Sequence, residues 1–387
     1  MKILIAHNTY QQRGGEDIVF EQESAMLATA GYDVRRFMVR NDHIHGLAGK
    51  IAAARSVIVN KASVAALRAE VDAFGPDIVH FHNFFPTLSP AAVAEVAGRG
   101  IPAVLTLHNY RLICAGGMLL RAGKPCEDCV AHSRWPGVIH GCYRGSPVGS
   151  ALIVGMGMYF RRLLERHHRA ITLIALTEFA KSRFVADGYL PERINVRGNT
   201  IADPGTGVRD RESRIVYVGR LSPEKGVDTL LNAARGVDGT IEIIGDGPER
   251  ARLEAMAGPN VVFRGQLPSP DVLERVKSAT SLAVPSRWYE GFPMVVLEAM
   301  ATGTPVLASR IGSLAEIVGH EQTGLLLPPD DATAWHDAMV NVLRSPSIAE
   351  TMGANARARF LEKHSVEIGM KSLGEIYARA CEKLTTT

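Results

Sequence analysis

The feature that most constrains this chain is a strict alternation of short apolar runs with helical patterns, which occurs twice along the sequence. The apolar runs are rich in Val, Ile and Leu, as buried strands are. Strands separated by helices run parallel and are joined by crossover connections. The alternation therefore predicts two consecutive α/β domains, each built on a parallel sheet.

The expected elements follow from the apolar pattern. In the first half the expected strands are 2–7, 32–39, 77–82, 102–107, 171–176 and 194–196. Helices are expected after the turn at 14–15 and over 89–98 and 178–187, and the stretch 41–74 is polar to amphipathic. In the second half the expected strands are 214–218, 240–245, 261–263, 281–284 and 305–308. Three helices follow residue 331, with breaks near 345–346 and 364–365.

The stretch 198–214 lacks a periodic apolar pattern and marks the expected linker. A length of 387 residues suits two domains, each with its own core. We predict Rossmann-like domains over 1–200 and 201–370, and a last helix over 371–387 that packs back on the first domain. Open parallel sheets bind ligands at the carboxyl ends of their strands, so we expect the ligand cleft where the two sheets face each other.

Composition and charge narrow the class of protein. No apolar run reaches the ~18 residues that a bilayer-spanning helix needs, and residues 1–6 are too short for a signal-peptide core, so we expect a cytoplasmic protein. Residues 1–200 carry 23 Lys and Arg against 16 Asp and Glu, whereas 201–387 carry 20 against 24. A basic first half favours a phosphate-bearing partner, although random scatter of charge is the alternative. Aromatic residues make up only 6%, which argues against a nucleic-acid partner.

The sharpest motif is WYEGFPMVVLEAM at 288–300, which follows an expected strand and opens a helix. Pro293 fits the first helical turn, where no N–H is needed. The N–H groups at that helix start form an anion site suited to a diphosphate. Glu298 is placed to accept hydrogen bonds from two ribose hydroxyls, and Glu290 to face what lies beyond the phosphates. The alternative is that both carboxylates only balance the helix dipole.

A second motif, VGRLSPEKG at 218–226, contains Arg220 and Lys225 on either side of a tight Ser-Pro turn. Two cations at the carboxyl end of a strand would stabilise negative charge on a leaving diphosphate. The alternative is a solvated turn in which one of the cations pairs with Glu224.

Together these two stretches resemble the retaining glycosyltransferases of family 4, the group 1 glycosyltransferases. Their hallmark is two glutamates separated by seven residues, here Glu290 and Glu298. Further matching stretches, in the family's order, are 219–226, 243–248, 303–306 and 323–330. A nicotinamide-binding G-x-G-x-x-G is excluded because Arg250 stands where the third glycine is required.

The resemblance implies the GT-B fold, in which two Rossmann-like domains with parallel sheets face each other across a cleft. Residues 1–200 would then be the acceptor-side domain and 201–370 the donor domain. It implies that Arg220 and Lys225 hold the diphosphate, that Glu298 takes the ribose and that Glu290 contacts the donor sugar. The remaining implied donor-binding positions are Gly219, Phe292, Pro293 and Met294. No cofactor is expected for the chemistry, because two cations and a helix dipole take the place of Mg²⁺.

In the first domain, Gly14 and Gly15 resemble the family's glycine loop, whose backbone approaches the donor phosphates; an ordinary strand-to-helix turn is the alternative. His108 ends an expected strand, and the resemblance makes it a donor-sugar contact that polarises a hydroxyl. A lone histidine at a strand end is otherwise more often structural. His80 and His82 are acceptor-site candidates, although the phenylalanines around them favour local packing.

Four of the five cysteines, Cys114, Cys126, Cys129 and Cys142, lie within a Gly- and Pro-containing insertion at 112–145. Cys126 and Cys129 form a C-x-x-C knuckle, which the other two flank at 11 and 12 residues' separation. Because cytosolic thiols stay reduced, a structural zinc site is expected rather than two disulfides. Plain reduced thiols remain the alternative.

An apolar run at 148–160 precedes Arg161, Arg162, Arg166 and Arg169. Such a segment suits a helix lying on an anionic membrane, where a lipid-linked acceptor would be found. A buried crossover helix with a basic exposed end fits the same residues.

The sequence therefore predicts a metal-independent retaining hexosyltransferase, cytoplasmic or at the inner face of the cell membrane. It would move a sugar from a UDP- or GDP-sugar to a saccharide or lipid-linked acceptor in the synthesis of a cell-surface polysaccharide or glycolipid. A nucleotide-sugar epimerase or hydrolase on the same fold and a non-catalytic sugar-nucleotide-binding protein are the alternatives. The residues do not distinguish double displacement from a front-face route.

Overall fold

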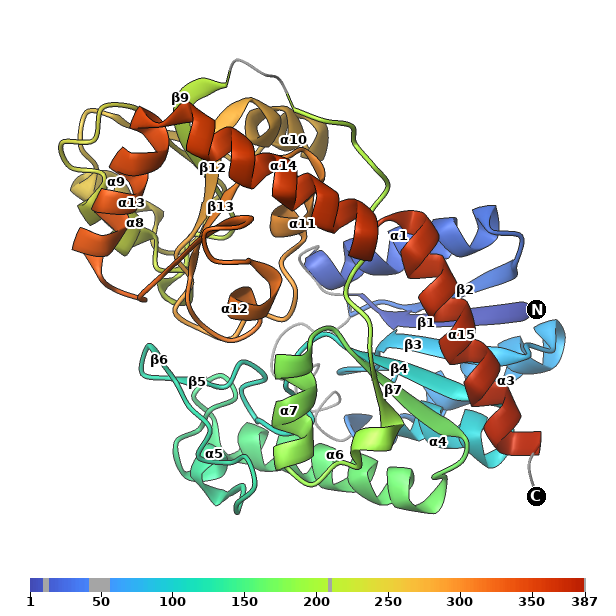
Figure 1. Cartoon of the computed structure of the whole chain (residues 1–387). Helices are drawn as coiled ribbons and strands as arrows, with labels where there is room; N and C mark the ends of the chain where they lie inside the picture. Colours follow the sequence, from blue (N-terminus) through green and yellow to red (C-terminus); the bar gives the residue numbers. More distant parts are fainter. Residues whose placement is uncertain (10–13, 42–55, 208–210, 386–387) are drawn as a thin grey trace. The chain divides into compact units, whose positions relative to one another are not determined.

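The computed structural model describes residues 1–9, 14–41, 56–207 and 211–385 and divides into two compact units (Figure 1). Unit 1 comprises Met1–Leu119, Cys126–Thr200 and Glu367–Thr387, and unit 2 comprises Leu120–Pro125 and Ile201–Val366. Parts of the expected amphipathic stretch (42–55) and of the expected linker (208–210) lie outside the described residues.

Unit 1 is built on a parallel sheet of six strands in the order β2-β1-β3-β4-β7-β8. The strands are β1 (Lys2–Asn8), β2 (Asp33–Val39), β3 (Ile78–Asn83), β4 (Ala103–Leu107), β7 (Ile171–Ala175) and β8 (Ile194–Val196). Every residue of β3, β4 and β7 is buried, as expected for parallel strands that are covered on both faces. The chain runs from β1 outward to β2 and then returns to β3 on the other side, so the direction of the strand order reverses between β1 and β3.

The helices of unit 1 include one from the far end of the sequence. They are α1 (Gly15–Thr29), α3 (Lys61–Phe74), α4 (Pro90–Gly98), α5 (Trp135–Ile139), α6 (Pro147–Arg166), α7 (Glu178–Ala186), the short η1 (Pro191–Arg193) and α15 (Val366–Thr385). The hydroxyl of Tyr377 on α15 lies 2.7 Å from Nδ1 of His80 on β3. Figure 1 shows α15 in red among the blue and green elements of this unit.

Unit 2 repeats the architecture with the strand order β11-β10-β9-β12-β13-β14, again parallel throughout. The strands are β9 (Glu212–Val218), β10 (Thr240–Ile244), β11 (Val261–Gly265), β12 (Ala279–Val284), β13 (Val306–Ser309) and β14 (Gly324–Leu327). Its helices are η2 (Pro223–Lys225), α8 (Val227–Ala233), α9 (Arg250–Met256), α10 (Ser269–Ser278), α11 (Met294–Ala301), α12 (Leu314–Ile317), α13 (Ala332–Arg344) and α14 (Pro346–Lys363). Here the strand order reverses between β9 and β12.

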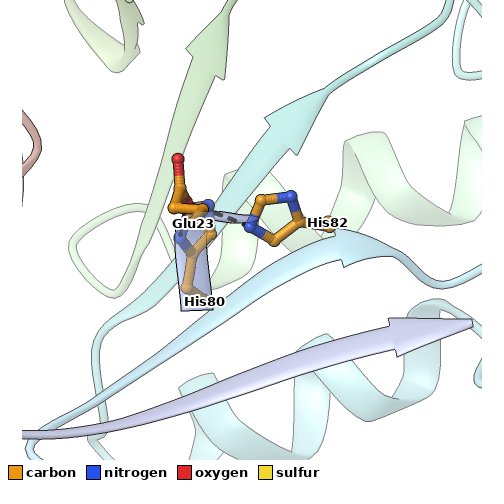
Figure 2. Close-up of side chains that lie close together, drawn as sticks. All are labelled: Glu23, His80 and His82. Atoms are coloured by element: carbon orange, nitrogen blue, oxygen red, sulfur yellow. Dashed lines mark hydrogen bonds and ion pairs between the residues drawn. The ribbon is translucent and has the colours of Figure 1, made fainter. Parts of the chain in front are cut away.

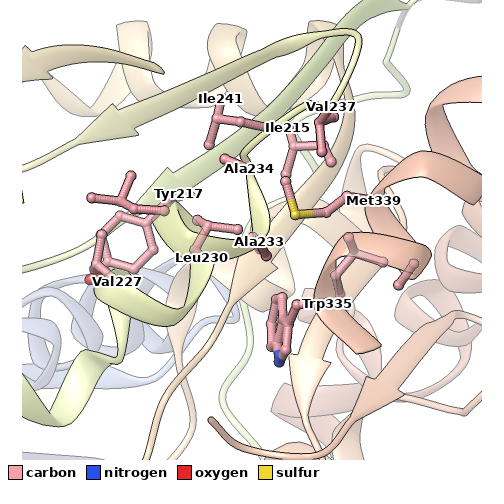
Figure 3. Close-up of a cluster of buried hydrophobic side chains, with 14 of the residues drawn as sticks. Ile215, Tyr217, Val227, Leu230, Ala233, Ala234, Val237, Ile241, Trp335 and Met339 are labelled. Atoms are coloured by element: carbon pink, nitrogen blue, oxygen red, sulfur yellow. The ribbon is translucent and has the colours of Figure 1, made fainter. Parts of the chain in front are cut away.

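The core of unit 2 lies between its sheet and the helices α8 and α13 (Figure 3). Trp335 on α13 is fully buried against apolar residues of β9 and α8, and its indole N–H donates to the carbonyl of Pro328 at 3.2 Å. That hydrogen bond removes the cost of burying the one polar atom of the ring. The sheet that carries the strand ends is therefore held by a well-packed apolar layer.

The observed architecture confirms the predicted fold class, two α/β domains with parallel sheets. The sequence-based strand boundaries differ from the observed ones by at most two residues, and β9 begins at Glu212 within the expected linker. The strand β14 was missing from the expected strands; its residues Gly324–Leu327 were noted only within the matching stretch 323–330.

Candidate active site

In unit 2 the two sequence motifs follow neighbouring strands. The 219–226 turn follows β9 and the 288–300 motif follows β12, and β9 and β12 pair directly where the strand order reverses. Open α/β sheets bind their ligands at this kind of switch point, outside the carboxyl ends of the strands. The topology thus brings the two predicted parts of a donor site to one edge of one sheet.

Lys225 and Glu290, one from each motif, form an ion pair. Lys225 Nζ lies 2.7 Å from Oε1 of Glu290, which also accepts a hydrogen bond from the Ser286 hydroxyl at 2.6 Å. The Glu290 side chain is 7% exposed and that of Lys225 is 23% exposed, and Lys225 also lies 5.4 Å from the centre of the Trp288 ring. The ammonium group is therefore fixed in place while keeping a face open to solvent.

Arg220 is exposed, and its guanidinium makes no hydrogen bond or ion pair with any described residue. Its backbone is nevertheless anchored, because the Arg220 carbonyl accepts a hydrogen bond from the Tyr217 hydroxyl at 2.9 Å. Burial, followed by the charges of Glu290 and Glu224, raises the pKa of Tyr217 well above its usual value, so the phenol stays a donor. The turn thus presents a fixed cation that no protein carboxylate neutralises.

Glu298 lies on α11, five residues after Pro293, which is the N-cap of that helix. The structure begins the helix at Met294, one residue later than the sequence pattern indicated for Pro293. The Glu298 side chain is largely buried, and no described residue donates a hydrogen bond to it. Burial raises the pKa of Glu298, because the charged form loses water without gaining a protein partner. A carboxylate in this condition is ready to accept hydrogen bonds from a ligand.

The glycines of the donor-side turns allow two backbones to approach closely. Gly245 has φ +135°, and a Cβ at this position would lie 1.9 Å from the carbonyl oxygen of Gly219. At Gly247 a Cβ would lie 2.3 Å from the carbonyl oxygen of Leu221. The turn after β10 is thus packed against the turn after β9, and only glycine fits at the contact. The predicted role of Gly219 in donor binding stays a prediction.

Phe292 is buried, 8% exposed, and its ring packs edge-on against His364 at 5.3 Å between ring centres. The side chain therefore shapes the entry to α11 by packing. The predicted phosphate contacts of Phe292, Pro293 and Met294 involve their backbone and stay predictions.

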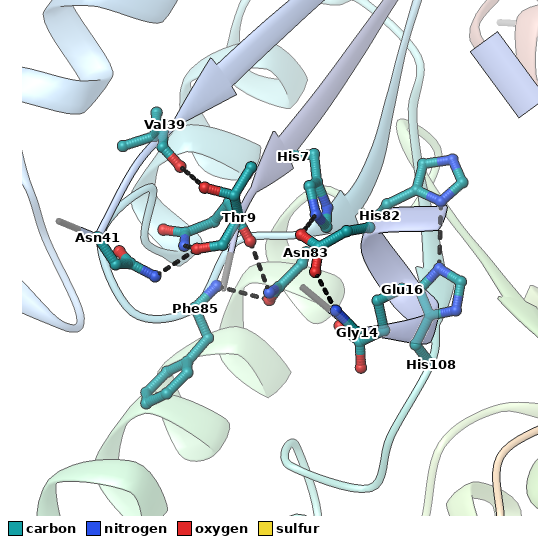
Figure 4. A network of polar contacts seen from close by, with 12 residues as sticks. His7, Thr9, Gly14, Glu16, Val39, Asn41, His82, Asn83, Phe85 and His108 are labelled. Atoms are coloured by element: carbon teal, nitrogen blue, oxygen red, sulfur yellow. Dashed lines mark hydrogen bonds and ion pairs between the residues drawn. The ribbon is translucent and has the colours of Figure 1, made fainter. Parts of the chain in front are cut away.

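In unit 1 the strand ends carry histidines that form one polar network (Figure 4). Nε2 of His108, just after β4, lies 3.1 Å from Nδ1 of His82 at the end of β3. Nε2 of His82 in turn lies 3.1 Å from Oε1 of Glu23 on α1. Burial lowers the pKa of His108 well below its usual value. His108 is thus a neutral ring at the sheet edge where the sequence placed it.

Glu23, His80 and His82 are the one group of three or more metal-ligand side chains in the described chain whose donor atoms lie within 4.8 Å of one another (Figure 2). Both ring nitrogens of His80 already have partners, the hydroxyls of Tyr377 at 2.7 Å and Thr106 at 2.8 Å. Arg197 Nη1 lies 2.5 Å from Oε2 of Glu23 and neutralises the carboxylate. A cation beside the carboxylate and an occupied histidine do not fit a metal site, so this group is a buried polar cluster.

His80 is fully buried, and burial together with His82 lowers its pKa to about 3. A neutral ring enclosed in this way cannot contact an acceptor, so the acceptor-site interpretation of His80 is wrong. His82 is 2% exposed and bonded to His108, which places it behind the candidate site.

Sequence reasoning missed Glu23, Arg197 and the pair His7–Asp17, whose Nε2 and Oδ1 atoms lie 2.9 Å apart. One signal for Glu23 was present: it stands three residues after Phe20 and four before Leu27, both buried on the same face of α1. A charged residue at an apolar helical position is seldom buried without a partner. Arg197 had no such signal, because its partner is 174 residues away.

Gly14 is the N-cap of α1, with φ −125°, and its N–H donates to Oδ2 of Asp17 at 2.8 Å. A Cβ at Gly14 would meet nothing closer than 3.9 Å, and one at Gly15 would meet no described atom within 4 Å. The folded backbone therefore does not itself require glycine at either position. Close approach of a ligand and an ordinary strand-to-helix turn both fit the pair, so the glycine loop stays a prediction.

The four clustered cysteines are free thiols of intermediate burial. A Cβ at Gly116 would lie 3.8 Å from Sγ of Cys114 and 3.9 Å from Cβ of Cys142, and one at Gly137 would lie 3.3 Å from Sγ of Cys129. Burial raises the pKa of Cys129, and the other three thiols add to this. All four thiols are thus neighbours, although no three of the sulfurs meet the 4.8 Å spacing that Glu23, His80 and His82 meet.

The apolar segment at 148–160 belongs to α6, which lies in the connection between β4 and β7. One face of α6 is buried, including Ile153, Met156 and Phe160, as expected for a crossover helix. Its other side, with α5, carries large exposed apolar side chains: Trp135 (68% exposed), Ile139 (72%), Val148 (74%) and Met158 (50%). Two of them, Trp135 and Met158, line a pocket of about 670 Å³ together with Val154 and Arg162. None of the described helices is long and apolar enough to cross a bilayer.

Comparison with known proteins shows matches along both halves. The family profile "Glycosyltransferase Family 4" matches residues 13–202, and the profile "Glycosyl transferases group 1" matches residues 200–359. An uncharacterised glycosyltransferase of Methanocaldococcus jannaschii is 31% identical over 313 residues, covering 79% of this chain and 76% of that protein. The alpha-D-kanosaminyltransferase of Streptomyces kanamyceticus is 28% identical over 240 residues, covering 55% of this chain and 62% of the relative. The chain spans about half the length of some curated relatives, such as a second M. jannaschii glycosyltransferase that is 34% identical over 204 residues (50% of each).

Solved structures share the fold. A sucrose-phosphate synthase from Thermosynechococcus elongatus has a TM-score of 0.73 at 22% identity, covering 97% of this chain and 98% of the other. Anabaena HepE, solved in complex with UDP and glucose, has a TM-score of 0.68 at 17% identity, covering 98% and 100%. The family profiles match both halves of the chain, and the fold has two parallel-sheet domains with the paired glutamates beside a strand switch point. This chain therefore belongs to family 4 of the glycosyltransferases, the group 1 family with the GT-B fold.

Proposed function

We propose that this chain transfers a sugar from a nucleotide-diphosphate donor to a hydroxyl of a saccharide or lipid-linked acceptor and retains the anomeric configuration. The observation that carries the proposal is the switch point of unit 2. There the guanidinium of Arg220 has no partner among the described residues, and the largely buried carboxylate of Glu298 has no donor among them. A diphosphate and a ribose are the two groups of a sugar nucleotide that need those partners.

The donor nucleotide is supported by likeness alone. HepE has been solved in complex with UDP, with UDP and glucose, and with UDP-glucose. Glu298, placed one and a half turns into α11, would accept from the two ribose hydroxyls, which UDP and GDP share. We therefore propose a UDP- or GDP-sugar and leave the base open.

For the transfer step we adopt the front-face route, which the resemblance to the family favours. The bond between the anomeric carbon and the diphosphate oxygen breaks, and the acceptor oxygen bonds to the anomeric carbon on the same face. The acceptor proton passes to the departing diphosphate, which acts as the base in this front-face route. Arg220 and Lys225 would stabilise the charge that develops on the diphosphate. Glu290 would hold Lys225 in position until the donor arrives and then face the donor sugar.

Because two fixed cations face the leaving group, we propose that transfer needs no divalent metal. Turnover in buffer free of Mg²⁺ and Mn²⁺ should equal turnover with either ion added; no strong chelator is used, because it would also remove zinc from the thiol cluster. A loss of activity that added Mg²⁺ or Mn²⁺ restores would contradict this part of the proposal.

The test begins with donor screening by thermal shift, since a ligand that binds the folded state raises its melting temperature. Transfer is then measured for Lys225→Ala and Glu298→Ala, which should lose about 100-fold or more in turnover while keeping the fold. Arg235→Ala, an exposed arginine in the same unit, is the matched control and should keep full activity. Near-wild-type rates in both site variants would overturn the proposal.

Two other activities remain to be distinguished. An epimerase or hydrolase would convert the sugar nucleotide with no acceptor present, whereas a transferase depends on the acceptor. A non-catalytic binding protein would show a donor-induced thermal shift and no turnover with any acceptor. Product analysis with and without acceptor separates these three outcomes.

For a lipid-linked acceptor we propose that the exposed side of α5 and α6 lies on an anionic bilayer. Trp135, Ile139 and Val148 would enter the interface, and the exposed Arg162 and Arg166 would meet lipid phosphates. Vesicles containing phosphatidylglycerol should bind the protein, and W135S/I139S should bind several-fold less. Equal binding of both proteins, or binding to neutral vesicles alone, would contradict this surface.

We also propose that the four neighbouring thiols of Cys114, Cys126, Cys129 and Cys142 hold a structural zinc ion. Four thiolates suit tetrahedral Zn²⁺, and binding would draw the sulfurs together and order a loop with little regular structure. Elemental analysis of protein purified without chelator should give about one zinc per chain, and C126S/C129S should give none. Less than a tenth of an equivalent in the unaltered protein would leave the thiols simply reduced.

A further inference from the structure

A chain of hydrogen bonds in unit 1 runs from Glu23 through His82 to His108. The charge of Glu23 determines which ring nitrogen of each histidine carries the proton. Glu23 is 3% exposed, and Arg197, which pairs with it, is 7% exposed. Burial by itself raises the pKa of Glu23, but the charge of Arg197 and the hydrogen bond from His82 help to hold the pKa well below the usual value. Glu23 is therefore an ionised carboxylate that only accepts hydrogen bonds.

The next link is His82. Its Nε2 lies 3.1 Å from Oε1 of Glu23, so Nε2 must carry the proton of that hydrogen bond (Figure 2). Arg197 already supplies one positive charge to Glu23, and His82 lies only 4.5 Å from the ring of His80. A second buried cation would be costly there, which favours a neutral His82 ring. In a neutral ring protonated at Nε2, the Nδ1 atom is an acceptor.

The last link is His108, whose Nε2 lies 3.1 Å from that Nδ1 atom of His82 and must therefore donate to it. The low pKa of His108 keeps its ring neutral, so its own Nδ1 carries a lone pair. No described residue bonds this Nδ1, and it is absent from the buried polar atoms that lack a partner, so it is open to solvent. Figure 4 shows this nitrogen on the side of the ring away from His82.

We propose that Glu23 and His82 are positioning residues that hold His108 as its Nε2–H tautomer, so that Nδ1 accepts a hydrogen bond from a substrate hydroxyl. The inference rests on the proposed sugar-transfer function for the identity of that hydroxyl. It adds a selection rule: the group bound at His108 must be a hydrogen-bond donor. A fluoro or deoxy sugar that lacks this hydroxyl proton should lose the contact. His108 stays neutral throughout and does not act as a cation.

The tautomer is measured without substrate, by the imidazole ¹⁵N shifts of [¹⁵N]histidine-labelled protein at pH 7.5. His108→Gln identifies the His108 signals by their disappearance. The expected result is a protonated Nε2 and an unprotonated Nδ1 on His108. Protonated Nδ1 on His108, or a doubly protonated His82, would overturn the proposal.

Glu23→Gln should reverse the direction of the hydrogen bonds along His82 and His108. The amide oxygen of Gln must face Arg197, which only donates, so the amide NH₂ faces His82 and reverses the polarity of both histidines. His108 should then carry its proton on Nδ1, and transfer should fall about tenfold or more. Glu21→Gln, an exposed change on the same helix, should leave the spectrum unchanged.

These outcomes separate the inference from the proposed function. If the wild-type tautomer is as expected and no donor is ever turned over, sugar transfer fails and the tautomer stands. If transfer is found but His108 carries Nδ1–H, the positioning proposal fails alone. If Glu23→Gln does not fold, the wild-type spectrum still decides.

Discussion

The switch points of the two units treat charged residues in opposite ways. In unit 1 the carboxylate of Glu23 is enclosed between Arg197 and two histidines, with every member buried. In unit 2 Arg220, after β9, is exposed, and Glu298, on the helix after β12, has no donor among the described residues. The difference indicates that the first cluster pairs its charges within the protein, whereas the second leaves them free for the proposed donor.

The largest expected effect comes from breaking the buried ion pair of Glu23 and Arg197. Glu23→Ala leaves Arg197 buried without its partner and should lower the free energy of unfolding of unit 1 by about 3–5 kcal/mol. Hydrogen exchange of the β3 amides measures the free energy of unfolding of unit 1 separately from that of unit 2. Glu21→Ala on the exposed side of α1 should change protection by less than about 0.5 kcal/mol. A similarly small effect for Glu23→Ala would remove the contrast between the units.

The second effect concerns the open site. Arg220→Ala should reduce turnover about 100-fold, a loss of about 2.7 kcal/mol in transition-state stabilisation. The melting temperature should not change, because Arg220 is exposed and has no described partner. Arg235→Ala is again the control. A fall in stability that matches the fall in activity would show that Arg220 is structural after all.

The third effect is a pH dependence confined to unit 1. The pKa of His80 is about 3 when folded, below its unfolded value, so the unfolded chain takes up the proton first. The contribution of His80 to the free energy of unfolding is fully present above about pH 6.5 and is lost as the pH falls toward 3. At pH 5 the free energy of unfolding should be lower by about 2 kcal/mol. Pulsed hydrogen exchange of β3 peptides in urea at pH 7.5 and 5 measures it. His80→Gln should flatten the slope, and exposed His168→Gln should not.

The smallest effect is that of salt. Exposed cations that bind a diphosphate are screened by ions, whereas buried pairs are screened much less. Raising NaCl from 0.05 to 0.3 M should weaken donor binding about three- to tenfold, while the His108 imidazole signals stay unshifted. Donor affinity that is independent of salt would argue that Arg220 does not meet the phosphates.

The sequence predicted the parts of this molecule that depend on local pattern. Apolar runs placed nearly every strand, and the two motifs placed Lys225 and Glu290 close enough to form the observed 2.7 Å pair. What it could not predict depends on long separations. His80 was an acceptor-site candidate, with local packing as the alternative, because its partner Tyr377 lies 297 residues away and the neighbouring residues give no sign of that hydrogen bond.

The last helix, α15, gives Tyr377 to His80, and the carbonyl of Gly369 to Arg197 at 3.1 Å. During synthesis, therefore, the first unit to leave the ribosome is not the first to be finished. The buried side chains of His80 and Arg197 gain these hydrogen bonds only when α15 is made, after all of unit 2. A chain that ends after Val366 should therefore fold its second unit completely and leave the first without Tyr377 and the Gly369 carbonyl.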